Sequence, residues 1–264
     1  MGKSVGQTNI DQAEESFKQF FKQATTDSDP FPYQWRFADA KELFELVHAP
    51  TGAGKTATAV LGWVWRYFYA NKPTPRRLAY CLPMRVLVEQ TYANTVLWLH
   101  NIGLLGGTAE FESRNGNRVL RAYSPCSDDP AKVTVHVLMG GEDVEEWDLD
   151  PEKPAVLIGT QDMLLSRALN RGYGMGRFRW PMHFGLLNND CLWVLDEIQL
   201  MGTGLATSTQ LQAFRESLGT FGAVKTVWMS ATLLPGWLAS VNYRDRIEPE
   251  LRHVGVSRPT CHCL

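Results

Sequence analysis

The stretch VHAPTGAGKTATAV, residues 47–60, links a short apolar run to a segment of helix-favouring residues through a loop that contains two glycines. It is close to the pattern G-x-x-x-x-G-K-[ST] of phosphate-binding loops, with Ala49 in the position of the first glycine. Gly52 and Gly54 would let backbone N–H groups approach phosphate oxygens, and the following helix would add the positive end of its dipole. An ordinary turn between a strand and a helix could have the same sequence, so the phosphate interpretation needs a second feature.

The second feature is a pair of acids at the end of another apolar run, in CLWVLDEIQ at residues 191–199. Such a pair is often only a solvated strand end, but together with the first feature it predicts a site for ATP and Mg²⁺. Asp196 and the Thr56 hydroxyl would hold the metal, Lys55 would reach the β- and γ-phosphates, and Glu197 would orient or deprotonate the attacking water. We therefore expect catalytic roles for Lys55, Asp196 and Glu197, metal ligation by Thr56 and Asp196, and nucleotide contacts from Pro50, Thr51, Gly52, Ala53, Gly54, Lys55 and Thr56.

Short apolar runs alternate with longer helical patterns along most of the chain. The runs occupy residues 43–47, 78–82, 134–139, 155–159, 191–195 and 225–230, and the helical patterns occupy residues 55–70, 84–100, 161–169 and 205–218. Runs that are apolar at consecutive positions are typical of strands covered by helices on both faces. The alternation predicts an α/β domain with a mostly parallel sheet and helices on both faces. Residues 103–132 lack clear periodicity and predict a surface excursion.

Length and composition favour one α/β domain, since 264 residues are long for one domain without requiring two. The 26 Lys and Arg nearly balance the 28 Asp and Glu, so any contact with nucleic acid must be local. The longest apolar segment, residues 59–70, is shorter than the roughly 20 residues that span a bilayer. Five scattered cysteines are typical of thiols in a reducing compartment, and no signal peptide is visible. We therefore expect a cytoplasmic protein that does not contact a membrane.

Three stretches of the chain, taken in order, resemble motifs of the first RecA-like lobe of superfamily 2 helicases. APTGAGKT at 49–56, VLDEIQ at 194–199 and MSAT at 229–232 are similar to motifs I, II and III, and that superfamily often has alanine where this chain has Ala49. PFPYQ at 30–34 resembles the upstream glutamine motif. That resemblance implies that Gln34 reads the adenine edge, with Phe17 as a candidate for stacking on the base.

Two further stretches resemble the strand-binding motifs of the same superfamily. CLPMRVLVEQT at 81–91 is similar to motif Ia and IGTQDML at 158–164 to motif Ib, both of which contact the backbone of a nucleic-acid strand. The resemblance implies strand contacts from Arg85, Thr160 and Gln161, and implies that Ser230 and Thr232 of motif III couple hydrolysis to strand binding.

Three of these motifs also have simpler explanations when each is taken alone. PFPYQ could be a proline-rich linker, LPMRVLVEQT could be an ordinary amphipathic helix, and MSAT could be a strand end that caps a helix. Their common order from residue 30 to residue 232 is what favours the helicase interpretation.

The residues around motif II resemble one particular group within this superfamily. NNDCLWVLDEIQLMGTGLATSTQLQAFR at 188–215, with GTQDMLLSRALNRGYG before it, looks like the helicase of type I CRISPR systems, which unwinds and degrades invader DNA. The resemblance implies single-stranded DNA and a CRISPR surveillance complex as partners. Gln199 departs from it, because relatives carry His or Asp there. The chain also has no His-Asp dipeptide and no motifs IV to VI, so we expect it to lack the family's nuclease and the second RecA-like lobe with its arginine finger.

These features together predict three parts of the chain: an N-terminal helix and linker at 1–30, a RecA-like ATP-binding helicase domain at 31–240, and the start of a linker to a second lobe at 241–264. Without the second lobe, we expect slow ATP hydrolysis and no translocation along DNA. Two alternatives remain open. One is the lobe of an RNA helicase or of a restriction-type translocase, and the other is a nucleotide-dependent binding module without turnover.

Overall fold

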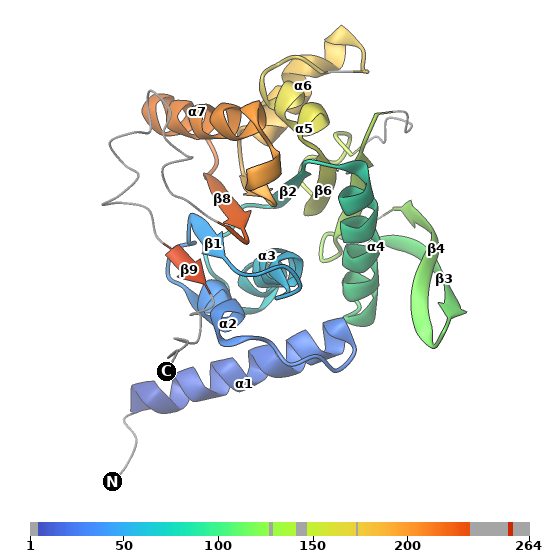
Figure 1. Cartoon of the computed structure of the whole chain (residues 1–264), viewed down its shortest axis with the longest axis vertical. Helices are drawn as coiled ribbons and strands as arrows, with labels where there is room; N and C mark the ends of the chain where they lie inside the picture. The colour runs from blue at the N-terminus through green and yellow to red at the C-terminus, as the bar shows by residue number, and fades with distance from the viewer. Residues whose placement is uncertain (1–4, 127–128, 141–146, 173, 233–252, 256–264) are drawn as a thin grey trace, which may run out of the picture.

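Seven strands, each parallel to its neighbours, form the sheet at the centre of the molecule. The computed structural model describes residues 5–126, 129–140, 147–172, 174–232 and 253–255. The strand order is β5-β6-β2-β7-β8-β1-β9 (Figure 1). The strands are β1 Leu46–His48, β2 Arg77–Leu82, β5 Thr134–Leu138, β6 Ala155–Thr160, β7 Cys191–Leu195, β8 Val224–Ser230 and β9 His253–Gly255. The predicted α/β fold with a mostly parallel sheet is confirmed.

Helices cover both faces of this sheet. On one face lie α1 Val5–Thr25, α2 Pro32–Asp39, α3 Lys55–Val64 and α4 Arg85–Asn101, and on the other lie α5 Gln161–Ala168, α6 Trp180–Leu187 and α7 Thr203–Leu218 (Figure 1). Alternate residues of β2 serve the two faces: Leu78 and Tyr80 belong to the core on the α3 side, and Ala79 and Cys81 to the core on the α7 side. Every residue of β2 is buried, which explains why the strands read as consecutive apolar positions.

The described residues also include three short helical segments. A π-helix, η1 Trp65–Tyr69, continues α3, and the 3₁₀ segments are η2 Arg177–Arg179 and η3 Ile198–Leu200. The buried Arg66 of η1 donates to the carbonyls of Ala38 and Ala40 at the end of α2. Helix α3 with η1 covers almost all of the helical pattern expected at 55–70.

Helix α1 packs directly on the domain. Phe17 is 1% exposed, and its ring centroid lies 5.4 Å from that of Trp35 and 5.3 Å from that of Trp65. Phe20 and Phe21 are buried in the same aromatic cluster. The three phenylalanines thus form one buried face of α1, and that face is part of the main core. The domain limit expected near residue 30 stays a prediction.

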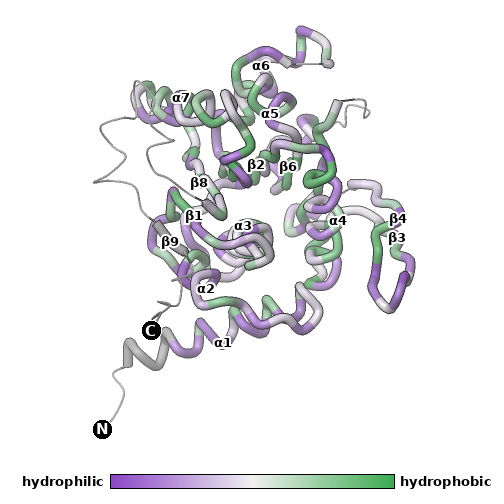
Figure 2. The backbone as a smooth tube through the Cα atoms, viewed as in Figure 1, coloured by the Kyte–Doolittle hydropathy of each residue, from purple (hydrophilic) through white to green (hydrophobic). Residues whose placement is uncertain are grey.

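A two-stranded antiparallel hairpin projects beside α4 (Figure 1). It consists of β3 Gly107–Arg114 and β4 Asn117–Pro125, joined at Asn115 and Gly116, whose φ angles are 52° and 81°. Two successive positive φ angles are typical of a type I′ turn, for which Asn-Gly is the preferred pair. Figure 2 shows that the far end of the hairpin is hydrophilic. The expected surface excursion is thus largely a regular hairpin with an exposed tip.

Strand β9 lies within the segment expected as a linker, residues 241–264. It pairs in parallel with β1, with Leu46 opposite His253 and His48 opposite Gly255, so these three residues extend the main sheet. The rest of that segment lies outside the described residues, and its role as a linker stays a prediction. Among the helices that the structure describes, none combines the length and apolarity needed to cross a membrane.

Replacing Phe17 tests the packing of α1. Phe17→Ala should lower the free energy of unfolding by about 3 to 5 kcal/mol, because it removes a buried ring from the aromatic cluster. The matched control is Phe221→Ala, which removes a fully exposed ring and should change stability by less than about 0.5 kcal/mol. Urea unfolding followed by circular dichroism measures both. Equal small effects in the two variants would contradict the burial of α1 against the domain.

Candidate nucleotide-binding site

Parallel pairing brings most of the expected site residues to one edge of the sheet. The register places His48 opposite Ser230, and Leu195 opposite Cys81. The loop after β1, the acids after β7 and the end of β8 therefore lie together at the carboxyl edge, where open α/β sheets bind their ligands.

The phosphate loop itself has the strand-loop-helix geometry that the sequence predicts. It occupies residues 49–54 between β1 and α3. Gly52 and Gly54 have φ angles of 82° and 76°, in the left-handed region that favours glycine. Gly54 is the N-cap of α3, so Lys55 and Thr56 begin the helix whose N-terminus faces the site.

Both ends of the loop are anchored by hydrogen bonds. The Ala49 N–H donates to the Ser230 carbonyl at 3.2 Å, which ties the loop to the end of β8. The Tyr33 hydroxyl donates to the Ala53 carbonyl at 2.6 Å, and Tyr33 is itself buried. Tyr33 was not expected at the site, although it lies inside PFPYQ beside Gln34, which was.

Gln34 lies behind the loop and supports it. Its side chain is 1% exposed, its amide nitrogen donates to the Gly54 carbonyl at 2.9 Å, and its oxygen accepts from the Phe31 N–H at 2.8 Å. A Cβ at Gly54 would lie 2.8 Å from the Gln34 nitrogen, so the two residues are closely packed. The expected contact of Gln34 with adenine stays a prediction. The expectation that Phe17 stacks on the base was wrong, because that ring is buried in the aromatic cluster.

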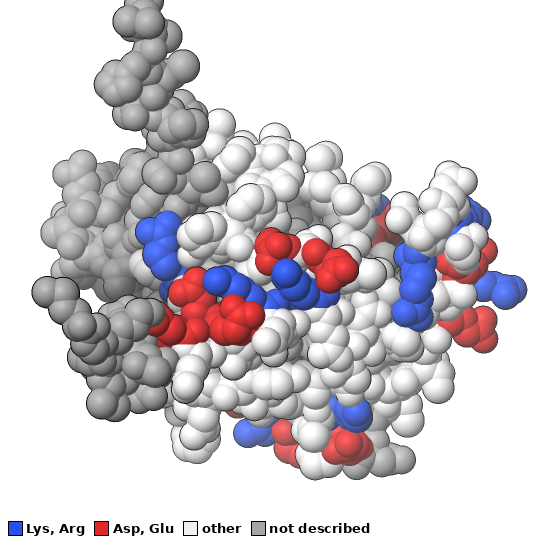
Figure 3. Space-filling model, turned by 90° about the horizontal axis from the view of Figure 1, so that it is seen from below, with Lys and Arg blue, Asp and Glu red and all other residues white. Residues whose placement is uncertain are grey.

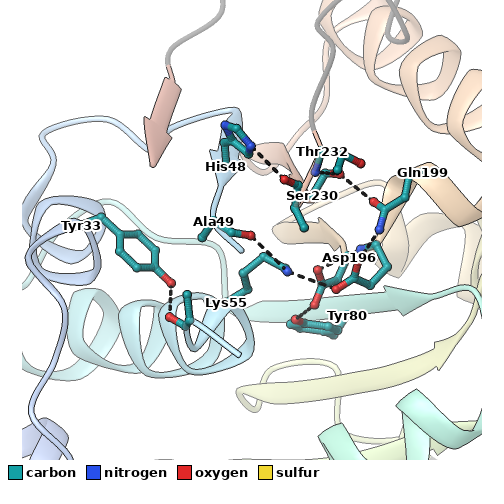
Figure 4. A network of polar contacts seen from close by, with 12 residues as sticks. Tyr33, His48, Ala49, Lys55, Tyr80, Asp196, Gln199, Ser230 and Thr232 are labelled. Atoms are coloured by element: carbon teal, nitrogen blue, oxygen red, sulfur yellow. Dashed lines mark hydrogen bonds and ion pairs between the residues drawn. The ribbon is translucent and has the colours of Figure 1, made fainter. Parts of the chain in front are cut away.

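Lys55 and Glu197 form an ion pair across the mouth of the loop (Figure 4). The Lys55 Nζ lies 3.1 Å from Glu197 Oε1 and 3.3 Å from the Ala49 carbonyl oxygen. The exposed fractions of the two side chains are 5% and 18%. Largely buried charges require a partner, so each residue holds the other in place. Any anion that attracts Lys55 would compete with Glu197 for the ammonium group.

Asp196 is buried at the end of β7 with both carboxylate oxygens engaged. Tyr80 donates to Oδ2 at 2.7 Å, and the Glu197 N–H donates to Oδ1 at 2.8 Å. Burial raises the pKa of Asp196 to about 6, although the Tyr80 hydrogen bond and the Lys55 charge act to lower it. Burial also raises the pKa of the Tyr80 phenol well above its usual range, so this group remains a donor. Tyr80 was not expected at the site, because its only signal in the sequence is a phenol hydroxyl within the apolar run LAYCL.

Gln199 links the acidic pair to the end of β8 (Figure 4). Its amide nitrogen donates to Glu197 Oε2, and its amide oxygen accepts from the Ser230 hydroxyl at 2.6 Å. The Thr232 N–H in turn donates to the Ser230 oxygen at 3.1 Å. The two oxygens of the Glu197 carboxylate are thus held by different groups, Lys55 and Gln199. The structure brings the expected pair Ser230 and Thr232 into this network, and places Gln199 at its centre.

A cavity of about 370 Å³ opens beside the loop and contains the groups that ATP and Mg²⁺ would need. Its walls include Thr51, Gly52, Gly54, Lys55, Thr56, Asp196 and Glu197, together with one face of α4, whereas Pro50 and Ala53 lie outside this lining. Among the described residues, no cluster of three or more His, Cys, Asp or Glu could hold a metal alone. One hydroxyl and one carboxylate from the protein suit Mg²⁺, which usually keeps water and substrate phosphates as its remaining ligands. Thr56 and Asp196 therefore fit a magnesium ion that is shared with a nucleotide.

The residues expected to contact a strand lie outside this cavity. Arg85 is exposed as the first residue of α4, and Thr160 ends β6. Gln161 begins α5 and lines a second cavity of about 620 Å³, which also includes Thr203 and Gly204 at the start of α7. Gln161 thus borders this open cavity, with Thr160 next to it in the chain, and the contact of both with nucleic acid stays a prediction.

Comparisons with known proteins agree with this arrangement. The profile of the DEAD/DEAH box helicase family matches residues 32–237. Similar solved structures include the DUF1998 helicase MrfA bound to DNA, with 14% identity and a TM-score of 0.56 over 92% of this chain and 30% of that one. The yeast DEAD-box splicing factor Prp28 has 18% identity and a TM-score of 0.54 over 91% of this chain and 48% of its own.

A third similar structure is S. cerevisiae Dbp5 bound to RNA and ADP BeF3, with 13% identity and a TM-score of 0.54 over 94% of this chain and 52% of that one. The chain thus spans about half the length of Prp28 and Dbp5 and less than a third of MrfA. Identities this low concern the fold alone, which is that of a RecA-like helicase lobe. No curated protein gives a significant match to the chain.

The pKa of Asp196 leads to a test of the site without any ligand. Because the folded-state pKa, about 6, is above the unfolded value, the folded state favours the protonated acid. The resulting stabilisation is fully present below the unfolded pKa and is lost as the pH rises through the folded pKa. Relative to Asp196→Asn, which does not titrate, the chain should lose roughly 2 to 3 kcal/mol of stability between about pH 4 and pH 7.

The measurement is the free energy of unfolding of both proteins at several pH values, without nucleotide or metal. Groups that do not interact with Asp196 titrate equally in the two proteins, so the difference reports this carboxyl group and its immediate partners. A difference that stays constant across the range would show that Asp196 is not desolvated in the folded chain.

Proposed function

Because the chain belongs to the DEAD/DEAH box helicase family, we propose that it is the ATP-hydrolysing motor lobe of a helicase that acts on single-stranded DNA. The observation that carries the proposal is the network at the phosphate loop. It contains a cation at the loop, a buried carboxylate for the metal and a second carboxylate held for the water, all at the carboxyl edge of the sheet. No other described surface combines a phosphate loop with two such acids.

Hydrolysis requires the transfer of the γ-phosphoryl group to water. A water oxygen bonds to the γ-phosphorus, the bond from that phosphorus to the bridging oxygen of the β-phosphate breaks, and the proton of the water passes to Glu197. Backbone N–H groups of the loop and Lys55 hold the phosphates, and Asp196 with Thr56 positions the metal. Bound Mg²⁺ would neutralise charge on the β- and γ-phosphate oxygens.

The ion pair of Lys55 and Glu197 gives this lobe a resting state. While Lys55 is paired with Glu197 at 3.1 Å, the ammonium group occupies Glu197 Oε1, so this oxygen is not free to contact water. A triphosphate in the loop would draw the ammonium group away and free Glu197 Oε1 for water. Gln199 would continue to hold Oε2, so the carboxylate would keep its orientation.

In this proposal, single-stranded DNA is the nucleic acid along which the helicase moves. Its contacts are Arg85, Thr160 and Gln161 along the carboxyl edge, with backbone N–H groups and hydroxyls supplying most of the phosphate interactions. Acidic and basic side chains are interleaved on the face that Figure 3 shows, so that face has no broad positive field. Among the similar structures, MrfA is bound to DNA and Dbp5 is bound to RNA, which is why the test below compares the two polymers.

The proposed role in CRISPR interference is supported by the residues around motif II, which resemble those of type I CRISPR helicases. In this proposal the chain serves CRISPR interference in the cytoplasm, and a CRISPR surveillance complex recruits it to invader DNA. A second RecA-like lobe closes over Glu197 and Ser230 and supplies an arginine finger, which in comparable enzymes accelerates phosphoryl transfer by about 10³ to 10⁵. By itself the lobe hydrolyses ATP slowly.

ATP hydrolysis by the purified chain tests the proposal. Turnover is measured with Mg²⁺ and ATP alone, with single-stranded DNA and with single-stranded RNA, each beside Lys55→Ala. We expect slow turnover that rises with DNA and disappears in the variant, because the variant lacks the phosphate-binding cation. Stimulation by RNA alone would show that the lobe acts on RNA and not on DNA. Turnover equal to that of Lys55→Ala in every arm would overturn hydrolysis by this lobe.

The role of Gln199 is tested by a double-mutant cycle. Gln199→Leu should reduce turnover by about tenfold while nucleotide affinity changes little, because it frees one oxygen of Glu197 without touching the loop. Ser230→Ala should have a similar effect, and the double variant should lose little more than either single one, because the two residues act through one connection. Fully additive losses would show that Gln199 and Ser230 act separately.

A further inference from the structure

The segment that connects α5 to α6, residues 169–179, differs in charge from the rest of the chain. Residues 163–189, which include it, contain four arginines and no acidic residue, whereas the whole chain has slightly more acids than bases. This α5–α6 loop lies at the outer end of the molecule, at the top of Figure 1. A local excess of positive charge, on a chain without a general one, favours contact with a polyanion at this loop.

The loop folds back on itself around Trp180. Gly172 is buried, and a Cβ at this position would lie 2.2 Å from the Met175 sulfur and 2.6 Å from the Trp180 Cδ1 atom. The Trp180 indole N–H donates to the Met175 carbonyl at 3.3 Å. The Arg177 guanidinium lies 5.9 Å from the centroid of the Trp180 ring. The start of the loop and the side chain of Arg177 are thus both placed against Trp180.

Consecutive residues of η2 point in different directions. Arg179 turns inward, where its Nε donates to the buried carboxylate of Asp148 at 3.1 Å. Arg177 is exposed and has no carboxylate partner among the residues that the structure describes. The Phe178 ring between them is 100% exposed. An exposed aromatic ring therefore lies next to an exposed cation that is available to an anion.

The other end of the loop adjoins one of the proposed strand contacts. Arg171 is exposed and lines the cavity of about 620 Å³ that also contains Gln161. The charged residues that line this cavity are Asp162, beside Gln161 in the chain, and Arg171, which belongs to the loop. Opposite charges attract and like charges repel, so an anionic strand that contacts Gln161 would be drawn to the Arg171 side of the cavity.

We propose that the α5–α6 loop binds single-stranded DNA, with Arg171 and Arg177 on phosphates and a base stacked on Phe178. The inference rests on the proposed function and extends its strand contacts beyond Thr160 and Gln161. Sites for single strands combine cations that follow the backbone with aromatic rings on which bases stack. The loop has both and contains no acid, so it fits a nucleic acid better than a protein partner. Duplex DNA fits less well, because its bases are already stacked on one another.

Binding of fluorescein-labelled oligothymidylate, measured by fluorescence anisotropy without ATP, tests the stacking. Phe178→Ala should weaken the affinity about tenfold, because one base loses its aromatic partner. Phe178→Trp should retain the affinity, because an indole ring also stacks on a base. The matched control is Phe221→Ala, which removes another fully exposed ring outside this loop and should leave the affinity within about twofold of the parent chain. Binding of duplex DNA should not respond to Phe178→Ala.

Salt dependence tests the arginines. The logarithm of the affinity falls linearly with the logarithm of the salt concentration, with a slope of about 0.7 for each phosphate contact on a single strand. Arg177→Gln should therefore reduce the slope by about 0.7, whereas Phe178→Ala should leave it unchanged. The matched control is Lys225→Gln, which removes an exposed cation from β8 and should change neither the affinity nor the slope.

Equal affinity of the parent chain, Phe178→Ala and Arg177→Gln for the single strand would overturn the proposal and would indicate a protein partner for the loop instead. Absence of binding by the parent chain would also overturn it. An equal loss for single strands and duplex in Phe178→Ala would exclude stacking on this ring.

Hydrolysis of ATP, measured separately, distinguishes this inference from the proposed function. A parent chain that binds DNA through the loop but does not hydrolyse ATP would count against the proposed function alone. A parent chain whose hydrolysis rises with DNA, together with loop variants that bind DNA as the parent chain does, would count against this inference alone.

Discussion

The site depends on one constraint, which is that the strands of the central sheet run in the same direction. Because β1, β7 and β8 all end at the same edge, three segments far apart in the chain meet there: the phosphate loop, the acidic pair and Ser230. A strand running in the opposite direction would carry its terminal side chains to the far edge. The direct bond from the Ala49 N–H to the Ser230 carbonyl shows how closely β1 and β8 are matched at this end.

The charges gathered at this edge are stabilised as a set. Lys55, Asp196 and Glu197 are largely buried, and the two carboxylates would be unfavourable without Lys55 and without the hydrogen bonds from Tyr80 and Gln199. Gln199 suits this environment because an amide donates to a carboxylate and accepts from a hydroxyl at the same time. An acid in its place would be the third carboxylate of the site and would add repulsion next to Glu197.

Residue pattern predicted most of the fold because strands buried on both faces must be apolar at consecutive positions. The phosphate loop was predictable because its backbone requires Gly52 and Gly54. The hairpin was not, because strands with two exposed faces need no alternation, although Asn115-Gly116 was the available signal. An N-terminal helix was predictable from the sequence, but the packing of Phe17 against Trp35 and Trp65 was not. The contacts of Tyr80 were equally hidden, since they depend on which strands become neighbours.

Strand β9 ends close to the nucleotide site. Because β9 runs parallel to β1, residue 255 lies at the carboxyl edge, next to the strand that enters the phosphate loop. A module attached there by a short tether would be held at high effective concentration around the nucleotide site, on the order of millimolar for a short flexible connection. Weak contacts with the site would then suffice to regulate it, and the length of the tether would set their strength.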